Sequence, residues 1–134
     1  MQTIEVVIVE DDETAAAIYV EFINKIEGFS VPYIANSAEQ ALEMLKIKKP
    51  DLILLDVFLP DMNGIECMWE IRKNYNNIDF ILITASNETD TVKEAIRGGA
   101  FSYIIKPVMM NRFLQTLDQY RQTFSQLSNE NALD

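Results

Sequence analysis

The chain of 134 residues has the length of one domain, and its 49% hydrophobic content is enough to bury a single core. Acidic residues outnumber basic ones by 21 to 11, and the resulting net charge of −10 repels a phosphate backbone, which disfavours DNA or RNA as a direct ligand. One cysteine excludes an internal disulfide framework, and the absence of histidine excludes a His-bearing zinc site or a histidine base.

The N-terminal residues lack the basic start and small-residue cleavage site of a signal peptide. Nor does any apolar run reach the roughly 20 residues that span a bilayer. We therefore expect a soluble, cytoplasmic protein with no membrane partner, whose partners are proteins or cations.

The first predicted strand is the run IEVVIV (4–9), which is β-branched and nearly uninterrupted, as in a strand buried on both faces. Residues 12–26 follow with the pattern of an amphipathic helix. Ile18, Phe22 and Ile26 share one predicted face of that helix. Together the two segments form a first β/α unit.

The second unit combines a predicted strand over 29–35 with a helix over 38–48. Pro32 has no N–H to donate to a neighbouring strand, so it predicts that this strand lies at a sheet edge. Ser37 and Gln40 have the spacing of a capping box and predict the start of the helix.

Three further units follow the same alternation. Their strands are predicted over 50–60, 79–86 and 100–107, and their helices over 64–75, 88–99 and 109–127. In the helix over 64–75, one predicted side carries Ile65, Met68, Trp69 and Ile71.

The last helix carries apolar residues at alternating steps of three and four: Met110, Phe113, Leu117, Tyr120, Phe124 and Leu127. This spacing fits a coiled-coil seam, but it fits plain packing on the sheet as well. The first half is expected to pack on the sheet, with Phe124 and Leu127 as the residues that could extend beyond it. Residues 128–134 are predicted to be a polar tail or linker.

Five β/α units require helical crossovers, which predicts a mainly parallel sheet with helices on both faces. In such sheets ligands bind at the carboxyl ends of the strands. The polar residues at those ends are Glu10, Asp11, Asp56, Thr84 and Lys106. Hard oxygen ligands without histidine or thiolate favour Mg²⁺.

The acidic run Glu10-Asp11-Asp12 needs an explanation, because like charges a few Å apart repel by about 4 kcal/mol at an effective dielectric near 20. A divalent cation would offset that repulsion. These acids also precede a helix, where carboxylates cap amides and complement the helix dipole. Asp12 is expected to be only a cap.

Asp56 directly follows the apolar run LILL, so its burial would cost several kcal/mol without a partner. Thr84 alone could be an ordinary strand threonine, and Lys106 alone could be a lysine that extends from a strand end to solvent. Lys106 is followed by Pro107, and this bond is a candidate cis peptide that aims the lysine inward.

Taken in order, these motifs resemble the receiver domain of a two-component response regulator. The resemblance rests on the acidic pair Glu10-Asp11, on LLDVFLPDMNG around Asp56, on ITAS, on GGAFSY and on Lys106-Pro107, and it covers residues 4 to about 122. It implies an α/β, flavodoxin-like, doubly wound (βα)5 fold whose five parallel strands have the order 2-1-3-4-5.

The resemblance also implies roles for the strand-end residues. Asp56 would be the phosphoacceptor that takes a phosphoryl group from a phosphohistidine of a partner kinase. The Mg²⁺ site, which Mn²⁺ could also fill, would use Asp11, Asp56, the main-chain carbonyl of Phe58, and Glu10 through water. Such a domain is not a classical enzyme, although it takes part in Mg²⁺-dependent phosphotransfer and autodephosphorylation.

Three further roles come from the same resemblance. Lys106 would pair with the transferred phosphoryl group, Thr84 would turn its hydroxyl to it, and Tyr103 would move inward as the second switch residue. These movements would change the face formed by the fourth helix, the fifth strand and the fifth helix. Homodimerisation through that face is the consequence expected in the family.

Within the family, the chain is similar to regulators paired with citrate and C4-dicarboxylate sensors, which carry a DNA-binding domain after the receiver. We therefore expect a receiver domain over 1–122, and the end of the last helix with a tail or linker over 123–134. Binding to DNA and control of transcription would require an output domain outside these residues.

Three positions depart from the commonest family pattern: Glu10, where aspartate is usual, Phe58 and Ser86. The last two border the route of attacking water, so the lifetime of a phosphorylated state stays open. The alternatives are a stand-alone receiver, a pseudo-receiver that acts by protein–protein interaction, and a haloacid-dehalogenase-type phosphatase, which would need an aspartate at Phe58. The missing Gly-rich loop disfavours a flavin or nucleotide binder.

Overall fold

A computed structural model describes residues 3–85 and 89–133 of the chain, with side chains over 3–85 and 90–126. Its five strands are β1 (Ile4–Val9), β2 (Phe29–Ala35), β3 (Leu52–Asp56), β4 (Asp79–Thr84) and β5 (Ser102–Ile105). Its five helices are α1 (Glu13–Ile23), α2 (Ala38–Leu45), α3 (Gly64–Asn74), α4 (Thr89–Arg97) and α5 (Met110–Leu133). Strand and helix alternate throughout, as predicted.

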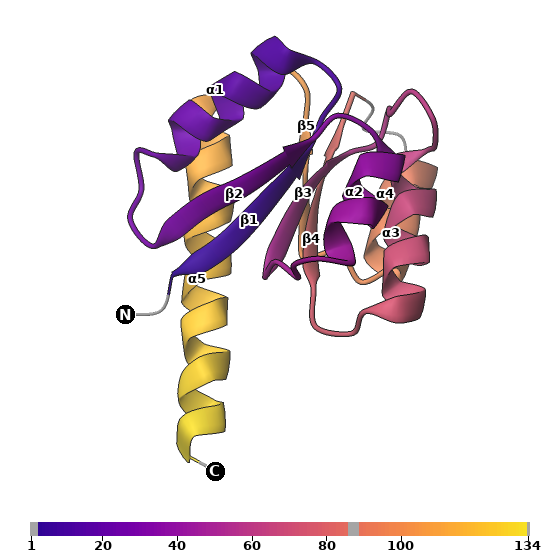
Figure 1. The fold of residues 1–134 in the computed structure, drawn as a ribbon. Coiled ribbons are helices and arrows are strands. Elements are labelled where there is room, and N and C mark those ends of the chain that lie inside the picture. The colour runs from indigo at the N-terminus through magenta and orange to yellow at the C-terminus, as the bar shows by residue number, and fades with distance from the viewer. Residues whose placement is uncertain (1–2, 86–88, 134) are drawn as a thin grey trace.

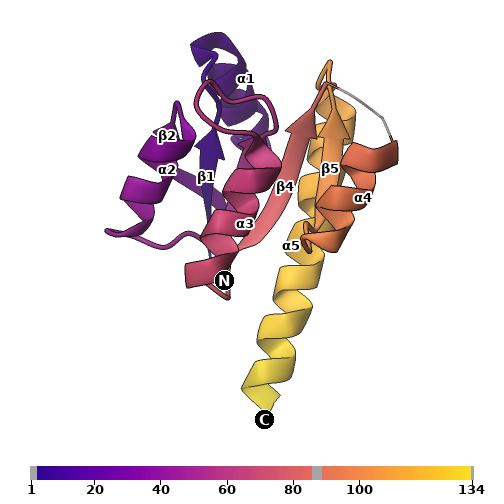
Figure 2. The same ribbon diagram turned by 90° about the vertical axis from the view of Figure 1, so that its right-hand side faces the viewer.

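The five strands form one parallel sheet with the order β2-β1-β3-β4-β5, which confirms the predicted doubly wound fold. Helices α1 and α5 cover one face of the sheet, and α2, α3 and α4 cover the other (Figures 1 and 2). Because parallel strands are joined by these crossover helices, all five carboxyl ends meet at the same edge.

Each face of the sheet packs its own hydrophobic core. The core beneath α1 and α5 includes buried residues of β1, β3, β4 and both helices, and the core beneath α2, α3 and α4 takes the alternate residues of the same strands. The central strand β3 is buried along its whole length. This two-sided burial explains why its sequence reads as a continuous apolar run.

Strand β2 lies at the edge of the sheet, which confirms the prediction from Pro32. The register between β1 and β2 shifts after the pair Glu5 and Ser30, so that Val7 lies opposite Tyr33. Pro32 is inside this irregular stretch. Edge strands and irregular stretches are the places in a sheet where a proline, which lacks an N–H, is accommodated.

Two predicted helix faces were partly wrong. In α1 the buried residues include Tyr19 and Ile23, while Ile18 is 40% exposed. In α3 the predicted Ile65, Met68 and Ile71 are buried, but Trp69 is 47% exposed. Large hydrophobic side chains do not by themselves determine which stripe of an amphipathic helix faces the sheet.

Several element boundaries also differ from the predictions. Strands β3, β4 and β5 are shorter than the stretches predicted for them. Helix α1 ends at Ile23 rather than near 26. Helix α5 continues to Leu133, beyond the predicted end near 127, and no glycine or proline occurs in the sequence after Pro107 to end it earlier.

The first half of α5 packs on the sheet, as expected. Phe113, Leu117 and Tyr120 are fully buried, and Phe124 packs partly against the same core and against the Tyr120 ring. The C-terminal part of the helix projects beyond the sheet (Figure 1). The side chain of Leu127 lies outside the described residues. Among the described helices, none combines the length and apolarity needed to cross a membrane.

Candidate functional site

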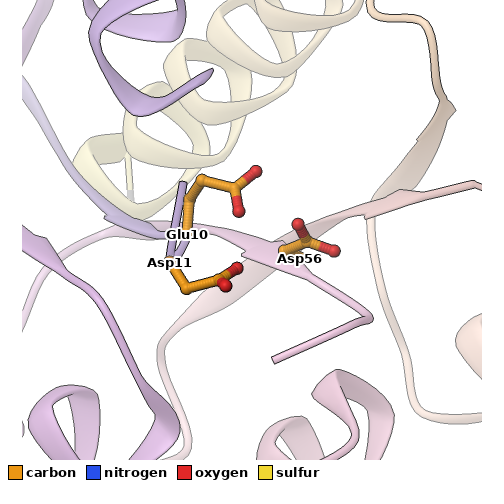
Figure 3. Close-up of side chains that lie close together, drawn as sticks. All are labelled: Glu10, Asp11 and Asp56. Atoms are coloured by element: carbon orange, nitrogen blue, oxygen red, sulfur yellow. The ribbon is translucent and has the colours of Figure 1, made fainter. Parts of the chain in front are cut away.

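The strand register brings the predicted polar residues together at the carboxyl edge. Val9 lies opposite Leu55, so Glu10 follows β1 at the level where Asp56 ends β3. Asp56 in turn lies opposite Ile83, the residue before Thr84. Ligand atoms of Glu10, Asp11 and Asp56 all lie within 4.8 Å of one another (Figure 3).

Asp56 is 1% exposed, so its carboxyl group is removed from water, which costs free energy unless partners compensate. Two contacts compensate it. The Lys106 ammonium lies 2.8 Å from Asp56 Oδ2, and the backbone N–H of Phe58 donates to Asp56 Oδ1 at 2.8 Å. A buried carboxylate that lost these partners would destabilise the fold by several kcal/mol, so its position depends on the neighbours that neutralise it.

Glu10 is 2% exposed and faces Asp56. Burial, followed by the hydrogen bond and the charge repulsion with Asp56, raises the pKa of Glu10 to about 7. The Lys106 ammonium, 3.7 Å from Glu10 Oε1, only partly offsets these effects. The backbone N–H of Asp12 donates to Glu10 Oε2 at 3.3 Å. Near neutral pH the site therefore holds more negative charge than one lysine can neutralise.

The adjacent acids Asp11 and Asp12, which follow β1, have different structural roles. Asp11 is exposed, and its carboxylate completes the cluster with Glu10 and Asp56. Asp12 is the N-cap of α1: its Oδ1 accepts from the backbone N–H groups of Thr14 and Ala15 at 2.9 and 3.2 Å. The prediction that Asp12 is a cap is confirmed.

Lys106 is the only cation that ion-pairs with the acidic cluster among the residues that the structure describes. Burial lowers its pKa, but the hydrogen bond and charge attraction from Asp56, with the charges of Glu10 and Asp11, outweigh this effect and raise the pKa of Lys106 above its usual value. The bond to Pro107 is cis, at the position where the sequence indicates a candidate cis peptide.

The remaining predicted residues surround this cluster. Thr84 is buried at the end of β4, and its carbonyl accepts from the Lys106 backbone N–H at 2.7 Å. Tyr103 is half-buried in β5 and packs against the core on the α2, α3 and α4 side. The Phe58 side chain is 59% exposed. Ser86 lies outside the described residues.

Two residues of the site escaped the sequence interpretation. Tyr19 of α1 is buried and its hydroxyl donates to Glu10 Oε1 at 3.5 Å; burial and the nearby acids raise its pKa. Its spacing with Ala16 and Ile23 is a helical stripe that could have indicated burial. Gly64 has no such signal: a Cβ there would lie 2.3 Å from the Asp56 carbonyl oxygen.

The chemistry of this donor set fits a hard divalent cation. Three carboxylates converge without histidine or thiolate, which matches the oxygen preference of Mg²⁺. One of the three, Asp11, is exposed and leaves access for water or a phosphate group. The adjacent ammonium supplies a second positive centre.

Comparison with known families decides what kind of domain carries this site. The family model described as the response regulator receiver domain matches residues 6–118. The chain is a response regulator receiver domain. The match begins within β1 and ends within α5, and such domains belong to two-component signalling systems.

Curated relatives of this receiver domain are response regulators of the citrate and C4-dicarboxylate type. It is 41% identical over 120 residues to the transcriptional regulatory protein CitT of Halalkalibacterium halodurans, covering 88% of the chain and 52% of that relative. It is 33% identical over 130 residues to the probable C4-dicarboxylate response regulator DctR of the same organism, covering 97% of the chain and 56% of the relative. The receiver domain thus spans about half the length of these relatives.

Solved structures agree with this fold. The receiver domain is similar to the crystal structure of the CheX-CheY-BeF3-Mg²⁺ complex from Borrelia burgdorferi, with a TM-score of 0.81 and 27% identity, covering 89% of this chain and 90% of that chain. That complex includes both Mg²⁺ and a beryllium fluoride group.

Proposed function

We propose that this receiver domain accepts a phosphoryl group on Asp56 from a phosphohistidine of a sensor histidine kinase. The observation that supports the proposal most directly is the buried Asp56 carboxylate, held 2.8 Å from the Lys106 ammonium within a cluster of three acids. A nucleophile in this position meets positive charge on one side and a cation site on the other.

Asp11, Asp56 and the main-chain carbonyl of Phe58 would hold Mg²⁺, or Mn²⁺ in its place, and Glu10 would act through water. When bound, the cation neutralises charge on the phosphoryl oxygens. An Asp56 carboxylate oxygen forms the new O–P bond as the P–N bond of the phosphohistidine breaks, and the released imidazole keeps the bonding electrons and takes a proton from water.

Lys106 changes partner during this transfer. Its ammonium pairs with the free Asp56 carboxylate, and after transfer it stabilises an oxygen of the acyl phosphate instead. Thr84 would turn its hydroxyl toward the phosphoryl group, and half-buried Tyr103 would move inward on the neighbouring strand. Hydrolysis of the acyl phosphate by water would reset the switch, and Phe58, two residues after Asp56, would slow that step by bordering the route of the water.

Homodimerisation would be the consequence of the movements of Thr84 and Tyr103. Four large apolar side chains of α4, β5 and the start of α5 are exposed: Ile96, Ile105, Met109 and Met110. An apolar group of this kind matches a second copy of the same face once the switch residues have moved. The phosphorylated chain should then elute as a dimer in size-exclusion chromatography.

Control of transcription is the output that the relatives support. CitT is named a transcriptional regulatory protein, and the receiver domain corresponds to about half of it. We propose that residues 1–122 form the regulatory unit and that residues 123–134, which include the end of α5 at Leu133, lead toward a DNA-binding output domain. The net charge of −10 argues that DNA contact would come from such a domain and not from the receiver.

Phosphorylation can be tested with acetyl phosphate as the donor. We expect the purified protein with Mg²⁺ to gain the mass of one phosphoryl group, and we expect EDTA to prevent the gain. Asp56→Asn should abolish it. Asp12→Asn is the matched control, because it neutralises an acid of the same edge that caps α1 and lies outside the cluster.

The outcomes separate the alternatives. A protein that gains no phosphate although it is folded would be a pseudo-receiver that acts by binding alone. Label retained in Asp56→Asn would assign the phosphoacceptor to another residue. Either result contradicts the proposal.

A further inference from the structure

The loop between β3 and α3 (57–63) is closed at its base. Phe58 and Asn63 form an antiparallel bridge, and the Gly64 N–H donates to the Val57 carbonyl at 2.7 Å. The exposed Phe58 ring provides little anchorage for the backbone that would present a carbonyl to the cation. The Phe58 backbone is held at one end by its N–H, which donates to Asp56 Oδ1 at 2.8 Å, and contacts of the loop tip add to this anchorage.

Asp61, at the tip of that loop, extends to a different element. Its Oδ1 accepts from the Ala38 N–H at 3.0 Å and its Oδ2 accepts from the Glu39 N–H at 2.9 Å. These amides belong to the first turn of α2, and both lie more than 20 residues away in the sequence. Hydrogen bonds from the Glu39 and Ala38 amides lower the pKa of Asp61, so the carboxylate stays charged and binds both donors strongly.

The corner that receives Asp61 is itself fixed. Ala35 and Ala38 are fully buried in the core beneath α2. The Ala35 carbonyl accepts from the Glu10 N–H at 2.9 Å. The β2–α2 corner (35–39) thus holds the backbone after β1 on one side and, through Asp61, the loop after β3 on the other.

We propose that Asp61 is a positioning residue: it clamps the loop after β3 onto the β2–α2 corner and thereby fixes the Phe58 carbonyl relative to Glu10 and Asp11 for divalent-cation binding. The inference rests on the proposed function, since it assigns Phe58 to the cation site. An ordinary helix cap would stabilise α2 and leave the cation affinity unchanged. If Asp61 is a clamp, its loss affects both the stability of α2 and the affinity for the cation.

Ser37 provides a matched control within the same helix. Its hydroxyl oxygen accepts from the Gln40 N–H at 3.1 Å, so Ser37→Ala removes a cap of α2 without a contact to the loop. Asp61→Ala removes the clamp. Asp61→Asn retains one acceptor oxygen and replaces the other by an amide that cannot accept, so it should be intermediate and serves as the isosteric variant if Asp61→Ala folds poorly.

Titration with Mg²⁺ alone, followed by the amide NMR signals of the purified chain, measures the cation affinity of each variant. We expect Asp61→Ala to raise the Mg²⁺ Kd about 10-fold, as for loss of a partner that orients a ligand, and Ser37→Ala to leave it unchanged. Without the cation, the amides of Phe58 and Asn63 should exchange with solvent faster in Asp61→Ala and at the wild-type rate in Ser37→Ala.

Equal Mg²⁺ affinities in wild type, Asp61→Ala and Asp61→Asn would overturn the clamp and leave Asp61 as a helix cap. So would an equal loss in Ser37→Ala, because general loosening of α2 would then explain the effect. A wild-type protein that binds no Mg²⁺ would instead overturn the proposed function. In that case the amide exchange rates alone would support or overturn the clamp.

Discussion

Replacement of Glu10 by glutamine should reveal how strongly the site disfavours its own negative charge. In the folded protein the pKa of Glu10 is raised to about 7 from 4.5, first by burial and then by Asp56. The fold therefore binds the proton more tightly than the unfolded chain does. The favourable contribution of protonated Glu10 is fully present below about pH 4.5 and is lost as the pH rises to about 7.

The size of this loss follows from the shift. A difference of about 2.5 units between 4.5 and about 7, at 1.36 kcal/mol per unit, sets a ceiling of about 3 kcal/mol. Glutamine carries no charge at any of these pH values. Glu10→Gln should thus gain stability relative to wild type as the pH rises from 4.5 to 7, by up to that amount.

Chemical denaturation followed by far-UV circular dichroism, at several pH values and without divalent cations, measures this difference. Taking the difference between variant and wild type cancels the titration of carboxylates that do not contact Glu10. Glu21→Gln, which neutralises an exposed glutamate of α1 outside the acidic cluster, is the control variant. Mg²⁺ should stabilise the wild type above pH 7 more than it stabilises Glu10→Gln.

A flat profile for Glu10→Gln would show that Glu10 is ionised in the fold at no extra cost. A profile of the opposite sign would show that Lys106 outweighs both burial and Asp56. Either result would refute the account of the acidic cluster as a site that needs a cation.

Two further predictions concern packing around the site. Gly64→Ala should lower the free energy of unfolding by about 1–3 kcal/mol, because the new Cβ would lie 2.3 Å from the Asp56 carbonyl oxygen. A urea titration measures this loss. Gly98→Ala is the control and should lose less stability, since its new Cβ meets the flexible end of the Met68 side chain. Cys67 is fully buried, and burial raises the pKa of its thiol to about 11. A thiol reagent at pH 8 should therefore modify Cys67 only after urea unfolds the chain. Rapid modification of the native protein would contradict the burial of Cys67 in the core.

Much of the fold follows from local sequence patterns. The buried strands read as short apolar runs because both of their faces are covered, and the capping residues Asp12 and Ser37 are recognisable because a cap acts within three residues of itself. Pro32 indicates an edge strand for an equally local reason, the missing N–H. These signals are sufficient for the alternation of elements and the order of the polar strand ends.

The tertiary structure decided which of those polar residues meet and which others join them. Only the register between β1 and β3 brings Glu10 level with Asp56. The Tyr19 hydroxyl reaches Glu10 from α1, and the Asp61 carboxylate reaches an amide 23 residues away in the sequence. Such contacts depend on how whole elements pack, and packing is set by the summed shape and burial of many side chains. Propensity and spacing act over a few residues, so the sequence alone indicates a site but not the contacts that hold it.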